Sequence, residues 1–197
     1  MAWGRALFRS GLAAAFVLAG VGCSGWSRAC GEDALDEGDA EAPPASVASA
    51  FAASDVVAEV AVVGTGERVM NEVFDERRIG RSTRSRAKRP YRGPVAGTEL
   101  SVLVDGASEN PERPDGGRTD WWFPDSALVE RGSTSVVFLR KGSGADYRPV
   151  ASTIVVEGDD VSIDDCGPYG GRLAAPFAED IEDDTATSLA DRLRDLA

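Results

Sequence analysis

The chain has 197 residues, of which 43% are hydrophobic and 27% are charged, and this composition predicts one sizeable globular domain plus a targeting segment. Its formal net charge is −12, so the chain as a whole repels phosphates, and we expect no nucleic-acid partner. The sequence contains no histidine, which excludes Ser-His-Asp triads, Cys-His dyads and imidazole-ligated zinc. Enzymes can also work with carboxylates, lysine or tyrosine, but the sequence contains only two lysines, Lys88 and Lys141. With so few catalytic side chains, we predict a non-catalytic protein without a metal or other cofactor.

Residues 1–22 are predicted to be an export signal. Arg5 and Arg9 make the first ten residues positive, and residues 11–21 form an uncharged apolar run. This order is typical of a secretory signal, and the run is shorter than the ~20 residues that a membrane-spanning helix needs. We expect the mature chain to work in the cell envelope or outside the cell.

The cleavage site has two alternatives. Residues 18–23 resemble the lipobox of bacterial lipoproteins, which would make Cys23 the lipidated first residue, although Gly20 replaces the usual large aliphatic residue. Cleavage after Ala29 by ordinary signal peptidase would instead leave Cys30 at the N-terminus. We favour a membrane anchor at Cys23, because a tryptophan and an arginine lie just before Ala29.

Residues 23–45 are predicted to form an acidic tether. They are rich in Asp, Glu, Pro, Ala and Gly and nearly free of large apolar residues, so the segment is expected to stay extended and solvated.

The chain has three cysteines, Cys23, Cys30 and Cys166. Export places them where disulfides form, and both cleavage sites remove Cys23 from pairing, either by lipidation or by loss of the signal. Both alternatives therefore predict a disulfide between Cys30 and Cys166.

Residues 46–177 are predicted to form a mainly β domain. A short helix begins with Ser46 as its N-cap, and short β-branched segments follow it without a helical period between them. Strands are predicted at residues 55–63, 99–104, 133–140, 147–157 and 160–163, with the glycines at 64 and 66 ending the first. This pattern is typical of a β-barrel or a β-sandwich.

Residues 178–197 are predicted to be an acidic linker followed by a helix. The run Glu179–Asp184 is nearly all acidic, whereas Leu189, Leu193 and Leu196 are spaced as one apolar helix face. Thr185 or Thr187 is the expected N-cap.

Residues 77–92 contain eight of the 21 basic residues and no acidic one. Three interpretations are open: a strand, a loop, or a binding patch for a polyanion. The strand is favoured because Arg84, Arg86 and Lys88 alternate with small residues, which would place these cations on one solvent face. The same three residues are the candidate polyanion patch.

A short helix leading into residues 53–60, a charged strand ending at 91–95, and segments at 100–104 and 128–139 occur in a characteristic order. Over residues 46–163 this order is similar to the netrin-like module of tissue inhibitors of metalloproteinases and of exported bacterial proteins. The resemblance implies an OB-fold-like closed or partly open barrel, with a short N-terminal helix and a C-terminal helix. In those inhibitors a free N-terminal cysteine chelates the protease zinc, and Cys30 matches it only after cleavage at Ala29.

Trp121 and Trp122 lie in the densest aromatic cluster. Neighbouring strand residues face opposite sides, so either both pack over the barrel or one is an exposed platform for a ligand. Taken together, we predict an exported or membrane-anchored binding module for an envelope or extracellular protein. A secreted protease inhibitor is the first alternative, and a carboxylate-based enzyme the second.

Overall fold

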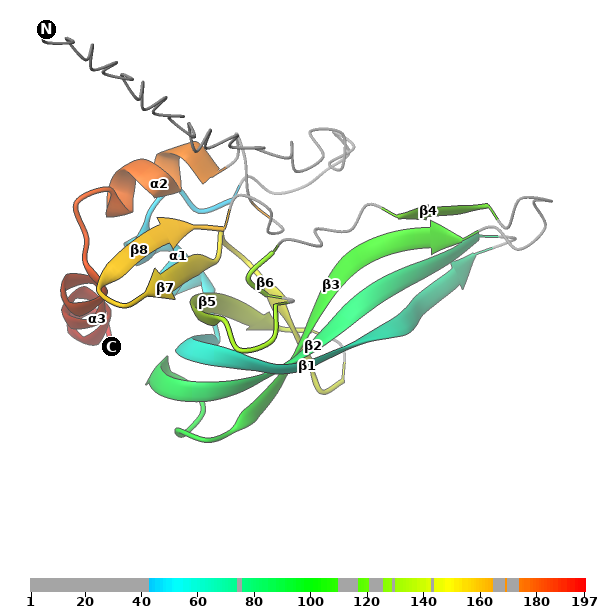
Figure 1. The fold of residues 1–197 in the computed structure, drawn as a ribbon, viewed down its shortest axis with the longest axis horizontal. Helices are drawn as coiled ribbons and strands as arrows, with labels where there is room; N and C mark the ends of the chain where they lie inside the picture. Colours follow the sequence, from blue (N-terminus) through cyan, green and yellow to red (C-terminus); the bar gives the residue numbers. More distant parts are fainter. Residues whose placement is uncertain are drawn as a thin grey trace, which may run out of the picture.

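The computed structural model describes residues 43–73, 76–109, 117–120, 126–128, 130–142, 144–164, 169 and 174–197 (Figure 1). The helices are α1 (Val47–Ala53), α2 (Ala175–Ile181) and α3 (Ala186–Asp195). The strands are β1 (Val56–Val73), β2 (Glu76–Arg92), β3 (Glu99–Glu109), β4 (Arg118–Asp120), β5 (Thr134–Lys141), β6 (Asp146–Pro149), β7 (Ile154–Glu157) and β8 (Asp160–Ile163). The chain is mainly β, as predicted, with short helices at both ends of the domain. None of the helices in these ranges has the length and apolar character that crossing a bilayer requires.

Five strands pair in a partial ring. β1 pairs with β2, β2 with β3, β3 with β6, β6 with β5, and β5 again with β1. Only the β3–β6 pair is parallel among the described strands. β7 and β8 continue the sheet from β5, and β4 pairs with the far end of β3.

The first strand is longer than predicted. Gly64 and Gly66 were expected to end it, but β1 continues through them to Val73. The pairing of β1 with β2 continues past two register shifts, one between Val62 and Gly64 and one between Val69 and Asn71, as it does at a β-bulge. The parts of β1, β2 and β3 that lie beyond the ring extend together away from the rest of the molecule, and we call them the arm (Figure 1).

Two cores lie on the two faces of β1 and β5. Alternate residues of β5 separate them, since Val137 and Leu139 belong to one core and Val136 and Phe138 to the other. The first core fills the ring: Val56, Ala58, Val60, Ala87, Leu100, Val102, Leu128, Val137 and Leu139. The second lies under the helices: Val47, Ala50, Phe51, Val57, Val136, Phe138, Ala151, Ile154, Phe177, Ile181, Leu189 and Leu193.

Both predicted helix starts are confirmed. The Ser46 hydroxyl accepts a hydrogen bond from the Ser49 backbone N–H, and the Thr185 hydroxyl accepts one from the Ser188 backbone N–H. Each pair forms a reciprocal capping box, which satisfies N–H groups that have no partner within the helix.

The acidic run Glu179–Asp184 differs from the expected linker, because its first part belongs to α2. Pro176 stands in the first turn, where proline is tolerated, and Phe177 and Ile181 bury one face of the helix. The Arg192 guanidinium of α3 contacts the carboxylates of Asp180 and Asp184. The helix therefore crosses the expected boundary between residues 177 and 178, and buried apolar residues outweigh the repulsion among its acids.

Candidate binding face

The basic stretch is a strand with one basic face, as the alternation predicted. Arg84, Arg86 and Lys88 are exposed on β2, whereas Thr83, Ser85 and Ala87 between them are buried. We call the surface formed by Arg84, Arg86 and Lys88 the basic face. The small buried residues face the ring interior, so packing of the ring fixes the direction in which the three cations point.

The three cations differ in their partners. Arg86 forms an ion pair of 3.1 Å with Glu99 of β3, and the Lys88 ammonium donates a hydrogen bond of 2.7 Å to the Thr134 hydroxyl. The Arg84 guanidinium lies over Gly64 of β1, with Nη2 3.0 Å from the position that a Cβ would take. Within the described ranges, Arg84 makes no hydrogen bond or ion pair. The Arg86–Glu99 pair is half exposed on both sides, so it contributes little free energy and can exchange for another partner.

The end of β2 next to the basic face carries a linked set of charges. Arg89 pairs with Glu59 of β1 at 3.7 Å and hydrogen-bonds Tyr91. Burial raises the pKa of the Tyr91 phenol, and the hydrogen bond with Arg89 opposes this rise. The pKa of Arg89 is raised by Tyr91 and Glu59, so its charge is fixed.

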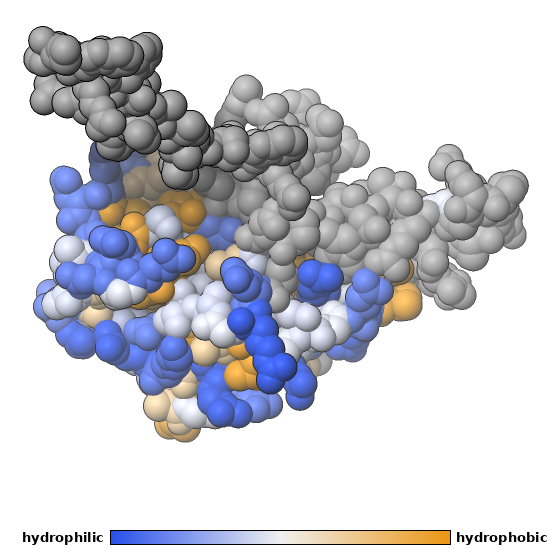
Figure 2. Space-filling model, viewed as in Figure 1, coloured by the Kyte–Doolittle hydropathy of each residue, from blue (hydrophilic) through white to orange (hydrophobic). Residues whose placement is uncertain are grey.

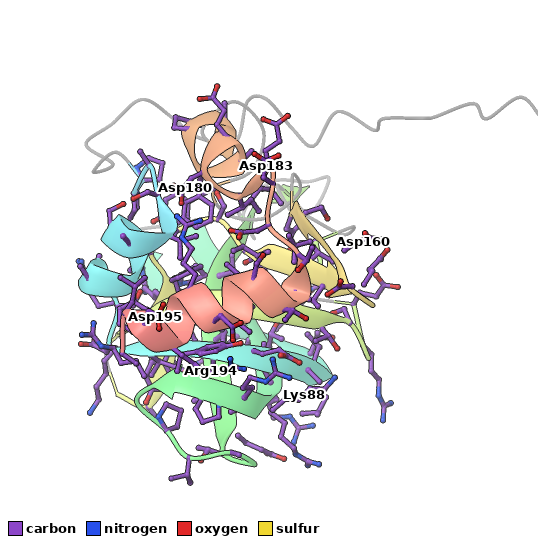
Figure 3. All side chains as sticks on the ribbon, turned by 90° about the vertical axis from the view of Figure 1, so that its left-hand side faces the viewer. Lys88, Asp160, Asp180, Asp183, Arg194 and Asp195 are labelled. Atoms are coloured by element: carbon purple, nitrogen blue, oxygen red, sulfur yellow. The ribbon has the colours of Figure 1, made fainter. Side chains whose placement is uncertain are left out.

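Charge is distributed unevenly over the molecule. β2 contains eight basic residues and one acidic residue, whereas residues 174–197 contain seven acidic and two basic ones. Figure 2 shows hydrophilic residues over the helical end, with hydrophobic residues in several separate areas. In Figure 3, Asp160, Asp180, Asp183 and Asp195 surround the helical end, while Lys88 lies on the sheet below α3. The basic face is thus a local exception on an acidic body.

A scan against protein-family models, a search of curated proteins and a search of solved structures each found no match.

A second polar cluster lies beside the basic face, and the sequence did not predict it. The Asp146 carboxylate on β6 is buried, accepts a hydrogen bond of 2.7 Å from the Ser101 hydroxyl, and forms an ion pair with Arg68 of β1. The hydroxyls of Ser82 and Ser101 are 3.1 Å apart. The cluster ties β1, β2, β3 and β6 together, and its residues stand as far as 78 positions apart in sequence.

A third cluster fixes the segment that precedes β5. The buried Asp164 carboxylate accepts a hydrogen bond of 2.6 Å from the Ser126 hydroxyl and one of 3.0 Å from the Ala127 backbone N–H. The same hydroxyl accepts from the Leu128 backbone N–H at 3.2 Å. These contacts place Leu128 in the ring interior, which gives the cluster a structural role. No group of three His, Cys, Asp or Glu residues in the described ranges is arranged to hold a metal ion.

The remaining predicted site residues lie outside the described residues. They are Cys23, Cys30 and Cys166, for the anchor and the disulfide, and Trp121 and Trp122, for the aromatic platform. Each of these assignments stays a prediction.

Proposed function

We propose that this protein is an exported, envelope-anchored, non-catalytic binding module that holds an acidic region of a partner protein against the basic face. The observation that carries this proposal is the alternation on β2, where Arg84, Arg86 and Lys88 are exposed and the residues between them are buried. Cations held in fixed directions by a packed strand form a preorganised surface for carboxylates.

The charge of the whole chain favours a folded acidic partner over a long polyanion. A long polymer of phosphates would extend beyond the basic face, and the acidic residues of the surrounding surface would repel its phosphates, since the net charge of the chain is −12. A compact acidic region of a protein contacts only the basic face. An envelope or extracellular protein is the expected partner, since the export signal predicts that compartment.

The strand order supports an OB-type arrangement. The ring runs β1-β2-β3-β6-β5 and returns to β1, with the parallel pair between β3 and β6, which is the order of the five strands in an OB fold. OB folds commonly bind ligands on the outer face of their second and third strands. The basic face lies on the second strand.

The proposal is tested with a short, fluorescently labelled oligo-L-glutamate peptide as the probe, in low and in physiological salt, because a short acidic segment contacts only the basic face. Arg84→Gln and Lys88→Gln are each expected to weaken binding about 1.4- to fivefold, since an exposed ion pair contributes ~0.2–1 kcal/mol. Lys141→Gln is the matched control, because it removes the same charge from an exposed lysine at the end of β5. Fluorescence anisotropy gives the dissociation constants.

Raising the salt concentration should bring the variants and the wild-type chain together, because screening weakens exposed charge pairs. Equal losses for Arg84→Gln, Lys88→Gln and Lys141→Gln would instead show that only net charge matters, and the basic face would lose its assigned role.

A further inference from the structure

The outer edge of β1 is paired over only part of its length. On one side β1 pairs with β2 from Val57 to Val73. On the other side it pairs with β5 only as far as Ala61, and the Val62 backbone then bonds to Gly132 and Ser133. From Gly64 onward, this second edge has no strand partner among the described residues, and in Figure 1 it borders the arm.

Part of this open edge is regular enough to accept another strand. Between the two register shifts, residues Gly64 to Val69 pair with β2 without interruption. An unpaired edge presents a row of backbone N–H and C=O groups that an extended segment can bind. Six residues span about 20 Å, which is the usual length of a strand.

The side chains on this edge leave room for an added strand. Gly64 and Gly66 have no side chain, and a Cβ built on Gly66 would meet no atom within 4 Å. Thr65 and Val69 are exposed, with Val69 at 53%. At Gly64 and Gly66 the edge therefore lacks the side chains with which an edge strand usually blocks an added strand. The charged residues of this segment, Glu67 and Arg68, follow the glycines, and Arg68 is already paired with Asp146.

Arg84 gives the edge a chemical preference. Its guanidinium leans from β2 across Gly64, which belongs to the edge strand itself. A strand added to β1 would lie ~4.8 Å further out, within reach of that guanidinium. Arg84 is exposed and has no hydrogen bond or ion pair with the described residues. A carboxylate of the added segment could therefore accept charge-assisted hydrogen bonds from its guanidinium.

We propose that residues Gly64 to Val69 of β1 accept an extended acidic segment of the partner protein as an added strand, with Arg84 binding one of its carboxylates. This proposal rests on the proposed function and states how the partner is held. Backbone hydrogen bonds supply the pairing, and Arg84 supplies the preference for an acidic sequence.

The test uses the full chain and a labelled peptide of alternating threonine and glutamate, roughly eight residues long. A second peptide has the same sequence, but the backbone nitrogens along one edge are methylated. A third has glutamine in place of glutamate. Anisotropy gives the affinities, and hydrogen exchange followed by mass spectrometry reports protection of the segment Gly64 to Val69.

The first peptide is expected to bind and to slow exchange in this segment. Methylation should weaken binding at least about tenfold, because it removes the donors that pair with the strand. The glutamine peptide, and the variant Arg84→Ala, should each weaken it about fivefold, while Arg84→Lys should recover part of the loss.

Equal binding of the methylated and unmethylated peptides would overturn strand addition and leave the basic face standing, since charge alone would then hold the peptide. Sedimentation showing that the free chain pairs through this edge with a second copy would also overturn the assignment. Failure of the proposed function is seen separately, in the oligo-L-glutamate comparison of Arg84→Gln with Lys141→Gln.

Discussion

Gly93, directly after β2, has a backbone conformation that an L side chain adopts only at a cost. Its φ is +92°, and a Cβ there would lie 2.9 Å from the Asp55 carbonyl oxygen and 3.0 Å from Val56 Cγ2. Gly97 has a similar φ of +87°, but a Cβ there would meet no atom within 4 Å. The pair separates backbone strain from steric contact.

Both Gly93→Ala and Gly97→Ala should destabilise the protein, Gly97→Ala by ~1 kcal/mol and Gly93→Ala by roughly 1–3 kcal/mol more. Urea unfolding of the two variants gives the difference. Similar losses would show that the start of β1 yields to the added methyl group.

The buried phenol of Tyr91 should make the free energy of unfolding fall at alkaline pH. Burial raises its pKa in the folded state, and the hydrogen bond with Arg89 only partly opposes this. The folded chain therefore holds the phenol proton more tightly than the unfolded chain, whose tyrosine has a pKa of about 10. The resulting stabilisation is complete below about pH 10 and is lost as the pH rises through the folded-state pKa.

Tyr91→Phe should therefore reduce the loss of unfolding free energy as the pH rises above about 10, relative to the wild-type chain. Urea unfolding across this range measures the slope, and Tyr147→Phe provides a matched phenol-to-phenyl change on β6. If Tyr91→Phe and the wild-type chain lose stability in parallel, the Tyr91 proton does not contribute.

At the scale of elements, α3 is held to the sheet by its apolar face. Leu189 and Leu193 are buried in the second core, whereas Leu196, which continues the same spacing, is 37% exposed. Leu193→Ala should cost about 2–5 kcal/mol, because it leaves a cavity among packed side chains. Leu196→Ala should change stability by less than ~0.5 kcal/mol.

Thermal or urea unfolding of Leu193→Ala and Leu196→Ala measures this difference, and hydrogen exchange shows whether α3 opens alone or with the sheet. Equal and small effects would mean that α3 adds little to the stability of the domain.

The elements that the sequence predicted well are those whose side chains alternate or repeat without interruption. The alternation of Arg84, Arg86 and Lys88 with small residues predicted which face of β2 is exposed. The spacing of Leu189 and Leu193 predicted the buried face of α3. The length of β1 and the presence of α2 were not predicted, for opposite reasons. The glycines of β1 suggested a turn although β2 pairs with them throughout, and the acids of α2 concealed Phe177 and Ile181.

The candidate site was predictable only in part. Local alternation was sufficient for the basic face, but the contact of Arg84 with Gly64 depends on the pairing of β1 with β2. The cluster of Arg68, Ser101 and Asp146 joins residues from three separate strands, and no local pattern announces such a contact. The netrin-like resemblance stays a prediction.

At the scale of the whole molecule, the basic face carries positive charge, whereas the chain as a whole is negative. If the basic face binds an acidic partner, as we propose, the net charge of −12 on the chain would help to orient that partner before contact, because the rest of the surface would repel it. A lipid at Cys23 would in addition restrict the domain to the neighbourhood of a membrane, since several acyl chains together make a stable anchor.

We propose that the domain works outside the cytoplasm as an anchored module. Mass spectrometry of the mature N-terminus, on protein recovered from fractionated cells, tests it most directly. An anchored module should be a membrane-bound chain that begins at a diacylglyceryl-modified Cys23. An unprocessed chain that still begins at Met1 and fractionates with the cytosol would contradict it.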